Sequence, residues 1–338
     1  HARRPASPDR QRVRQADPRN PAELTMPPLH IVALSLLLVP LGQAEETPRH
    51  LGPITGIVIG GDHIYSVSQA GVFREAKRLA KPRFRVMSMA GAPKKNAEPI
   101  LLLGGGQPAS SGEIAAIDPA NGTLARRKLG DDLVYSVGVS PDGKTAAAAM
   151  ADGRVLTFDF PSLATESVIE ASRHQAVVRV VAFSPDGQWL ASAGLDGLVL
   201  LTPLKPGAKP IVLSDHSAGV ESLAFAPDSS QFASGSRNGR VRLHSIGGRL
   251  LRTFQRVGEP PDATGFGQAP RVLCLAWGNT ALIGGTSTGY IFRLPSGQGN
   301  WQPLHRDQAG PVYSVGQAPG QIVAGKTGQV LKLAESAK

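Results

Sequence analysis

A three-strand pattern recurs along the chain and limits the possible fold more than any other feature. The clearest copies are VYSVGVSPDGKTAAAAMADGRVLTFDF from Val134, VRVVAFSPDGQWLASAGLDGLVLLTPL from Val178 and VESLAFAPDSSQFASGSRNGRVRLHSI from Val220. Each copy has an alternating apolar strand, a Pro-Asp turn, a second strand, an Asp-Gly or Asn-Gly hairpin turn and a third strand. In every copy, ten residues separate the end of the first turn from the glycine of the second, as from Gly143 to Gly153. This fixed spacing indicates a structural repeat.

Four fainter copies flank these three. The seven units begin at residues 54, 84, 134, 178, 220, 272 and 312. The 294 residues after residue 44 give each unit about 42 residues, which suits a four-stranded blade. Variable segments such as 210–214 are expected to supply the fourth strands. Each sheet is apolar on both faces, so it must stack between two neighbours, and a closed ring covers the final pair. The sequence therefore predicts an all-β fold, a seven-bladed β-propeller of four-stranded antiparallel sheets, over residues 45–338.

The seventh unit has three strands of its own, and five residues follow its last strand near Leu333. We expect residues 45–51 to complete this sheet, because an unpaired strand edge is a cost that closed folds avoid. Pro48 lies in that segment and cannot donate a backbone hydrogen bond.

The first 44 residues differ in composition from the repeats. Residues 1–25 are rich in Arg and Pro, and we expect a disordered or untranslated leader there. Residues 26–44 contain an apolar core of 11 residues, Ile31–Leu41, followed by Gly42 and Ala44 at the positions of small residues before a cleavage site. This segment is predicted to be a signal peptide cleaved after Ala44, although it lacks a basic residue before the core. The protein is then expected to be periplasmic or secreted. The alternative, a membrane anchor, needs about 20 apolar residues, so we expect no stable membrane span after cleavage.

Charge and cysteine content limit the chemistry. The formal net charge is +10, and it becomes +7 without residues 1–25. We interpret this mild excess as a solvated face or an attraction to anionic surfaces, and expect no nucleic-acid partner. Cys274 is the only cysteine and is expected to be buried, so no disulfide forms within the chain. The eight histidines show no pairing at short spacing, and we predict no metal and no cofactor. Asp131 and Asp132 fit a solvated turn better than a calcium site.

With seven such units, the chain resembles the WD40-repeat family over essentially all of residues 45–338, most specifically from 134 to 246. The resemblance implies a toroidal propeller that serves as a platform for protein or peptide partners. The Trp that closes the third strand in the family is replaced here by Phe158, Thr202, His244 and Leu294. The family's histidine before the first strand is found as His174 and His216. These departures predict blades held by apolar packing, without the buried His-Ser-Asp-Trp network typical of the family.

Two candidate binding surfaces follow from the resemblance. In WD40-like propellers, the residue after the first Val of V-x-x-V faces the mouth of the channel, opposite the Pro-Asp-Gly turns. Here these rim residues are Thr55, Arg85, Tyr135, Arg179, Glu221, Leu273 and Tyr313. Arg and Tyr are frequent in interface hot spots. The second candidate is the long loop 258–270, with Glu259, Asp262 and Phe266, which is expected on the same face.

We therefore predict a non-enzymatic scaffold that binds a protein or peptide partner through its rim, with no catalytic residues. The alternative is a propeller enzyme similar to lactonases or quinoprotein dehydrogenases, with a metal or cofactor at the axial channel. That alternative needs acidic, Asn or His ligands on several inner strands, whereas the rim offers only Glu221. A third possibility, a subunit that docks on a cytochrome or another redox complex, fits the expected location and charge.

Overall fold

The structure is a computed structural model that describes residues 50–75, 77–94, 97–164, 169–205, 207–259, 269–278, 281–295, 300–306, 310–318 and 320–334. The predicted leader, residues 1–25, and the predicted signal peptide, residues 26–44, lie outside these ranges. The described residues all belong to one unit, residues 44–338. Every regular element among them is a β-strand, so they contain no helix that is long and apolar enough to cross a membrane.

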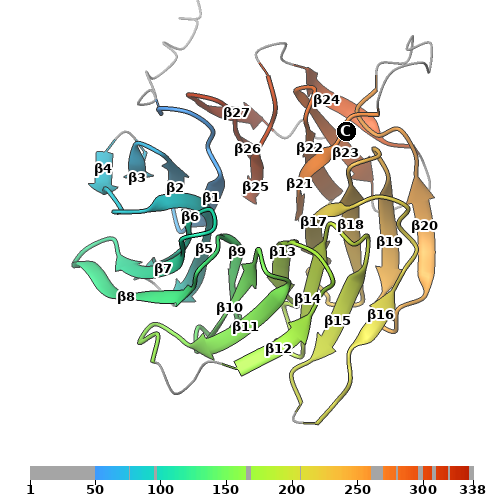
Figure 1. Ribbon diagram of the computed structural model, residues 1–338. Coiled ribbons are helices and arrows are strands. Elements are labelled where there is room, and N and C mark those ends of the chain that lie inside the picture. The colour runs from blue at the N-terminus through green and yellow to red at the C-terminus, as the bar shows by residue number, and fades with distance from the viewer. Residues whose placement is uncertain are drawn as a thin grey trace, which may run out of the picture. The chain divides into compact units, whose positions relative to one another are not determined.

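Seven antiparallel sheets follow one another along the chain, and we call them blades 1 to 7 (Figure 1). Blade 1 consists of β1 (Gly56–Gly60), β2 (His63–Ser68), β3 (Gly71–Arg74) and β4 (Lys77–Ala80). Blade 2 consists of β5 (Arg85–Lys94), β6 (Ala97–Gln107), β7 (Ser111–Asp118) and β8 (Gly122–Gly130). Blade 3 consists of β9 (Val134–Val139), β10 (Thr145–Met150), β11 (Arg154–Asp159) and β12 (Ile169–Arg173). Blade 4 consists of β13 (Val178–Phe183), β14 (Trp189–Gly194), β15 (Val199–Pro203) and β16 (Ile211–Leu213).

The three remaining blades repeat this order. Blade 5 consists of β17 (Val220–Phe225), β18 (Gln231–Ser236), β19 (Val241–Ser245) and β20 (Leu250–Phe254). Blade 6 consists of β21 (Val272–Trp277), β22 (Ala281–Thr286), β23 (Tyr290–Pro295) and β24 (Gln302–Arg306). Blade 7 contains three strands in the described residues, β25 (Ser314–Ala318), β26 (Gln321–Gly325) and β27 (Val330–Ala334).

The first strand of every blade lies at the centre of the ring, and the last strand lies outside (Figure 1). Each inner strand contacts the inner strands of both neighbouring blades, and β25 of blade 7 contacts β1 of blade 1. The ring therefore closes, and the predicted all-β, seven-bladed propeller is confirmed. The segment 210–214, predicted as a fourth strand, contains β16.

The junction between blades 7 and 1 is held by backbone hydrogen bonds. The His50 nitrogen donates to the Gly328 oxygen at 3.1 Å, and the Gly328 nitrogen donates to the Gly52 oxygen at 3.0 Å. The Ile54 nitrogen donates to the Lys326 oxygen at 3.1 Å. The chain that enters blade 1 is thus fastened to blade 7. Residues 45–49, most of the predicted fourth strand of that blade, lie outside the described residues, so this strand stays a prediction.

The hydrophobic core is divided into layers between adjacent blades. Between blades 2 and 3, for example, Leu102 and Ile114 pack with Val137 and Met150, and all four side chains are buried. Burying a large aliphatic side chain stabilises the fold by about 1.5–3 kcal/mol. Because each sheet contributes side chains to the layers on both of its sides, no blade is covered until its two neighbours are in place.

The structure corrects the prediction that the blades lack the buried histidine network. In blade 4, the His174 Nε2 atom lies 2.9 Å from the Ser192 hydroxyl, and Nδ1 lies 2.9 Å from the Asp196 carboxylate. In blade 5, the His216 Nε2 atom lies 2.7 Å from the Ser234 hydroxyl. The prediction was wrong because the His, Ser and Asp positions can pair without the Trp.

Blade 1 contains a third member of this set, His50. Its ring nitrogens lie 2.9 Å from the Ser68 hydroxyl and 3.0 Å from the Ser66 hydroxyl. His50 precedes Ser68 by 18 residues, the same separation as in blades 4 and 5. We had placed His50 in the expected fourth strand of blade 7, although this separation from a serine was visible in the sequence.

Candidate functional site

At the start of each inner strand, one side chain points toward the mouth of the central channel. In blades 3 to 6, the first residue pair of the inner strand is followed by a register shift, so one residue has no partner on the next strand. The residues in this position are Tyr135, Arg179, Glu221 and Leu273. A β-bulge of this kind bends the strand and redirects the side chain of the extra residue. The same backbone feature thus presents four different side chains on one rim.

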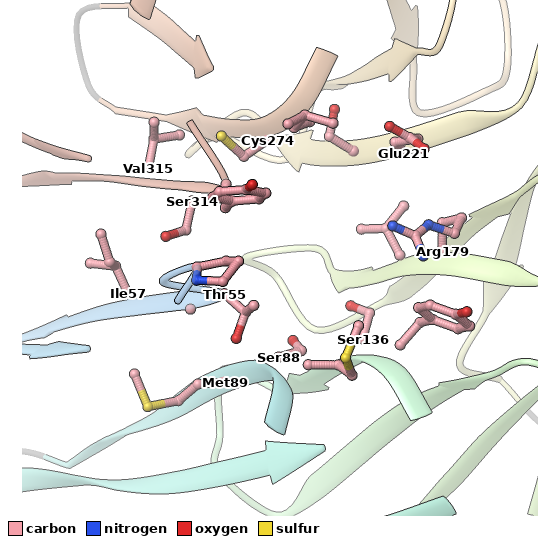
Figure 2. A pocket seen from close by; sticks show the side chains of 18 of the residues that line it. Thr55, Ile57, Ser88, Met89, Ser136, Arg179, Glu221, Cys274, Ser314 and Val315 are labelled. Atoms are coloured by element: carbon pink, nitrogen blue, oxygen red, sulfur yellow. The ribbon is translucent and has the colours of Figure 1, made fainter. Parts of the chain in front are cut away.

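The side chains at the rim and just below it surround one cavity of about 360 Å³. Its lining includes all seven predicted rim residues, Thr55, Arg85, Tyr135, Arg179, Glu221, Leu273 and Tyr313. Figure 2 shows labelled side chains from every blade around this space, among them Thr55, Ser88, Arg179 and Cys274. The structure therefore brings the predicted residues together, and their role in partner binding stays a prediction.

The alignment of blade 2 with the other blades needs a correction. Its register shift lies between Val86 and Ser88, so Met87 is the extra residue and the equivalent of Tyr135. Arg85 pairs with Gly106 one step before the bulge, is exposed, and still lines the cavity. We had aligned the blade on Phe84 instead of Val86, two residues too early. The V-x-S pattern of Val86 to Ser88 was the signal for the right alignment.

Sequence reasoning missed a second ring of small polar residues, one position after the rim. Their hydroxyl or thiol groups bind the backbone of the next blade, in its inner strand or just before it. The bonds run from Ser222 Oγ to the Val272 oxygen (3.0 Å), from Cys274 Sγ to the Val312 oxygen (3.5 Å), from Ser314 Oγ to the Ile54 oxygen (3.0 Å), from the Val137 nitrogen to Ser88 Oγ (3.2 Å), and from the Val181 nitrogen to Ser136 Oγ (3.2 Å). A small residue in the third place of V-x-x-V was the signal, and Val180 of blade 4 is the exception.

Among the described residues that line the cavity, Glu221 is the one carboxylate, and it is already paired. Its side chain is 2% exposed. Both carboxylate oxygens bind the guanidinium group of Arg271, with Arg271 Nε donating at 3.0 Å, and Arg237 Nε lies 3.6 Å away. Buried carboxylates need such partners, because an unpaired buried charge is strongly destabilising. Arg271 and Arg237 were also missed, since they lie outside the V-x-x-V pattern.

Arg179 has a different environment. Its guanidinium carbon lies 4.4 Å from the centre of the Tyr135 ring, a cation–π contact. The Nε atom is buried and has no hydrogen-bond partner among the described residues, and no carboxylate of that set forms an ion pair with the group. Arg85, on the other side of blade 3, is likewise without an ion pair to the described residues. The cavity mouth therefore carries two cations that the described part of the protein does not neutralise.

Cys274 lies in the cavity wall, half-buried, and burial raises the pKa of its thiol to about 12. The group is then a protonated hydrogen-bond donor at neutral pH and not a nucleophile. Within the described ranges, no group of three or more His, Cys, Asp or Glu side chains is placed to hold a metal ion. These side chains do not fit the donor set that a metal-dependent propeller enzyme requires.

The second predicted surface, loop 258–270, is described only at its ends. Glu259 forms an ion pair with Arg256, and Asp262 and Phe266 lie outside the described residues. The loop joins β20 to β21 and returns through Arg271, the partner of Glu221. Its described C-terminal end thus lies beside the rim. A role of Asp262 and Phe266 in partner binding stays a prediction.

Comparisons with known proteins agree with this architecture. The family model described as "WD domain, G-beta repeat" matches residues 166–201, which contain β12 to β14 and the start of β15, and residues 207–245, which contain β16 to β19. A search of curated proteins gave no match. Among solved structures, the WD40 beta propeller domain of Doa1 is similar, with a TM-score of 0.69 and 17% sequence identity over 86% of this chain and 95% of that one. At this identity the likeness shows the fold alone. The chain thus contains WD40 repeats at residues 166–201 and 207–245, within a seven-bladed propeller whose fold is that of a WD40 domain.

Proposed function

We propose that the protein is a non-enzymatic scaffold that binds a protein or peptide partner at the mouth of its central channel. The observation that carries the proposal is the convergence of seven rim side chains, one from each blade, on a single cavity. Concave sites with a few convergent polar groups on a rigid framework are typical of binding sites. Arg and Tyr, the residue types that dominate interface energetics, supply four of the seven side chains.

The chemistry of the lining favours binding over catalysis. Glu221, the one carboxylate of the lining, is held by two arginines, so it is poorly placed to accept a proton from a substrate. The Cys274 thiol stays protonated because burial raises its pKa to about 12. The remaining polar side chains of the lining are Arg, Ser, Thr and Tyr, which suit hydrogen bonding to a partner.

The proposed partner lies outside the cytoplasm. Support comes from the predicted signal peptide at residues 26–44, which lies outside the described residues. Mass spectrometry of the protein purified from its native cells tests this step, and the expected mature chain begins at Glu45. A chain that retains residues 26–44 in the cell would contradict export by cleavage.

The binding site itself is tested by site-specific photocrosslinking in the native cells. A photoreactive amino acid at position 313, on the rim, is expected to give a defined protein adduct. The same group at position 142, in the turn at the opposite end of a blade, is expected to give none. Adducts of equal yield from both positions, or from position 142 alone, would place the partner elsewhere on the propeller.

A matched pair of charge reversals completes the test. The rim variant carries Arg85→Glu and Arg179→Glu. The control variant carries Lys144→Glu and Arg249→Glu, the same charge change in exposed turns between strands on the opposite face. The rim variant is expected to lose the adduct while the control keeps it. Equal retention in both folded variants would contradict a role of the rim arginines.

A further inference from the structure

We propose that the cavity mouth recognises a carboxylate side chain in an acidic segment of the partner, and that Arg179 is the residue that binds it. This inference rests on the proposed function and names the chemistry of its partner. It follows from the charge balance of the mouth, from the fixed position of the Arg179 guanidinium group and from the supply of hydrogen-bond donors in the lining.

Among the described residues, the charge balance at the mouth is positive. Two guanidinium groups, those of Arg85 and Arg179, line the cavity. Two more, those of Arg237 and Arg271, pair with the rim carboxylate Glu221. Because Glu221 is occupied by Arg271 and Arg237, it does not neutralise the other two arginines. A concave, partly desolvated site with an excess of one charge attracts ligands of the opposite charge. The site is therefore selective for an anionic group.

Arg179 is held in place before any partner arrives. Its guanidinium group lies over the Tyr135 ring, with 4.4 Å from the guanidinium carbon to the ring centre. The planar fork of an arginine so fixed loses little conformational freedom when it binds a carboxylate. The buried Nε lacks an acceptor among the described residues, which leaves a hydrogen bond to be made. A carboxylate that takes two hydrogen bonds from this group is the best-matched ligand.

Neighbouring hydroxyl groups add donors and no negative charge. Ser88 and Ser136 accept hydrogen bonds from the backbone nitrogens of Val137 and Val181, so their own hydrogens are available to donate. Both serines belong to the cavity lining. A carboxylate oxygen accepts such bonds, whereas an ammonium or guanidinium group of a basic partner does not.

The size of the site favours a side chain over a long polyanion. A cavity of about 360 Å³ admits a few side chains. Nucleic acids bind by contact with a run of phosphates along an extended basic surface. Here the two unpaired arginines point to one concave site, and Met87, Met89 and Leu273 provide apolar walls beside it. The expected motif is an acidic residue with an apolar neighbour.

Fluorescence anisotropy with defined peptides tests the inference. The probe is a fluorescein-labelled peptide of four Glu-Leu repeats with blocked ends. The control peptide has Gln in place of Glu. The wild-type protein is expected to bind the Glu peptide more tightly than the Gln peptide, with a loss of affinity at higher salt. Arg179→Gln is expected to weaken binding of the Glu peptide about tenfold or more, because a charge-assisted bidentate bond is lost. Arg249→Gln, on the opposite face, is expected to leave it unchanged.

The outcomes separate this inference from the proposed function. Equal binding of the two peptides, or an Arg179→Gln variant that binds the Glu peptide as well as the wild type, overturns the acidic partner. If the position 313 crosslink persists in that case, the scaffold function stands without it. A single-stranded oligonucleotide that competes with the Glu peptide at lower concentration than the unlabelled peptide itself also overturns the inference. Retained far-ultraviolet circular dichroism shows that each variant is folded.

Discussion

The histidine of blade 4 provides a measure of what the buried network contributes to stability. His174 hydrogen-bonds to the Ser192 hydroxyl and to the Asp196 carboxylate, whereas His216 of blade 5 bonds to the Ser234 hydroxyl only. The two residues are 4% and 8% exposed, so their burial is similar. A neutral hydrogen bond contributes about 0.5–1.5 kcal/mol to stability and one to a charged group about 1.5–3 kcal/mol. We expect His174→Phe to lower the free energy of unfolding by about 2–4 kcal/mol and His216→Phe by about 0.5–1.5 kcal/mol.

The assay is equilibrium unfolding in urea, followed by tryptophan fluorescence and far-ultraviolet circular dichroism. Asp196→Asn serves as a second variant, because it keeps the shape of the acceptor and removes its charge. In the His174→Phe background it is expected to cost less than in the wild type, since the two residues contact each other. Equal losses in the His174→Phe and His216→Phe variants would refute the claim that the carboxylate bond makes the difference.

Three further predictions concern other parts of the fold. Burial lowers the pKa of His50 to about 4 and of His216 to about 3. Because these histidines take up protons near pH 6.5 in the unfolded chain but not in the folded one, the urea midpoint is expected to fall as the pH drops from 6.5 toward 4. The fall is expected to be less steep in the His216→Phe variant. A maleimide at pH 8 is expected to label Cys274 in the native protein far more slowly than in the unfolded chain, since burial raises the thiol pKa, and equal rates would contradict this. Gly285→Ala would place a methyl group 2.5 Å from Val312 Cγ1 of the next blade, so we expect a loss of about 1–3 kcal/mol in unfolding free energy, against little change for Gly247→Ala, where the nearest atom is 3.9 Å away.

The fold was predictable from the sequence because its unit is local. The Pro-Asp-Gly and Asp-Gly turns at Gly143 and Gly153 each fix a hairpin within a few residues, and both glycines adopt positive φ angles in the structure. Seven copies then leave one way to cover every apolar face. Blade 2 was the exception, because its longer strands β5 and β6 obscured the repeat and shifted the alignment by two residues.

The electrostatics of the candidate site were less accessible to sequence reasoning. Position in V-x-x-V identified Arg179 and Glu221 as neighbours on the rim, but not that one is unpaired and the other paired. The partner of Glu221 is Arg271, 50 residues away along the chain. Its role depends on how blades 5 and 6 pack side by side, and no local pattern records that contact. The His174 network was missed for a different reason. Its members lie within one repeat, but the absence of the Trp led to the prediction that the whole network is missing.

Successive residues of the inner strand have separate roles, and this separation supports the proposal that the rim binds a partner. The residue after the bulge, such as Ser222 or Cys274, binds the backbone of the next blade and helps to close the ring. The bulged residue itself, such as Arg179, points into the cavity and makes no hydrogen bond to the described residues. Substitutions there change the chemistry of the mouth at little cost to the fold. Glu221 is the exception, because its removal leaves Arg271 without a partner. Under the proposed function, the rim arginines are therefore the positions at which substitutions are expected to change partner choice without a large change in stability.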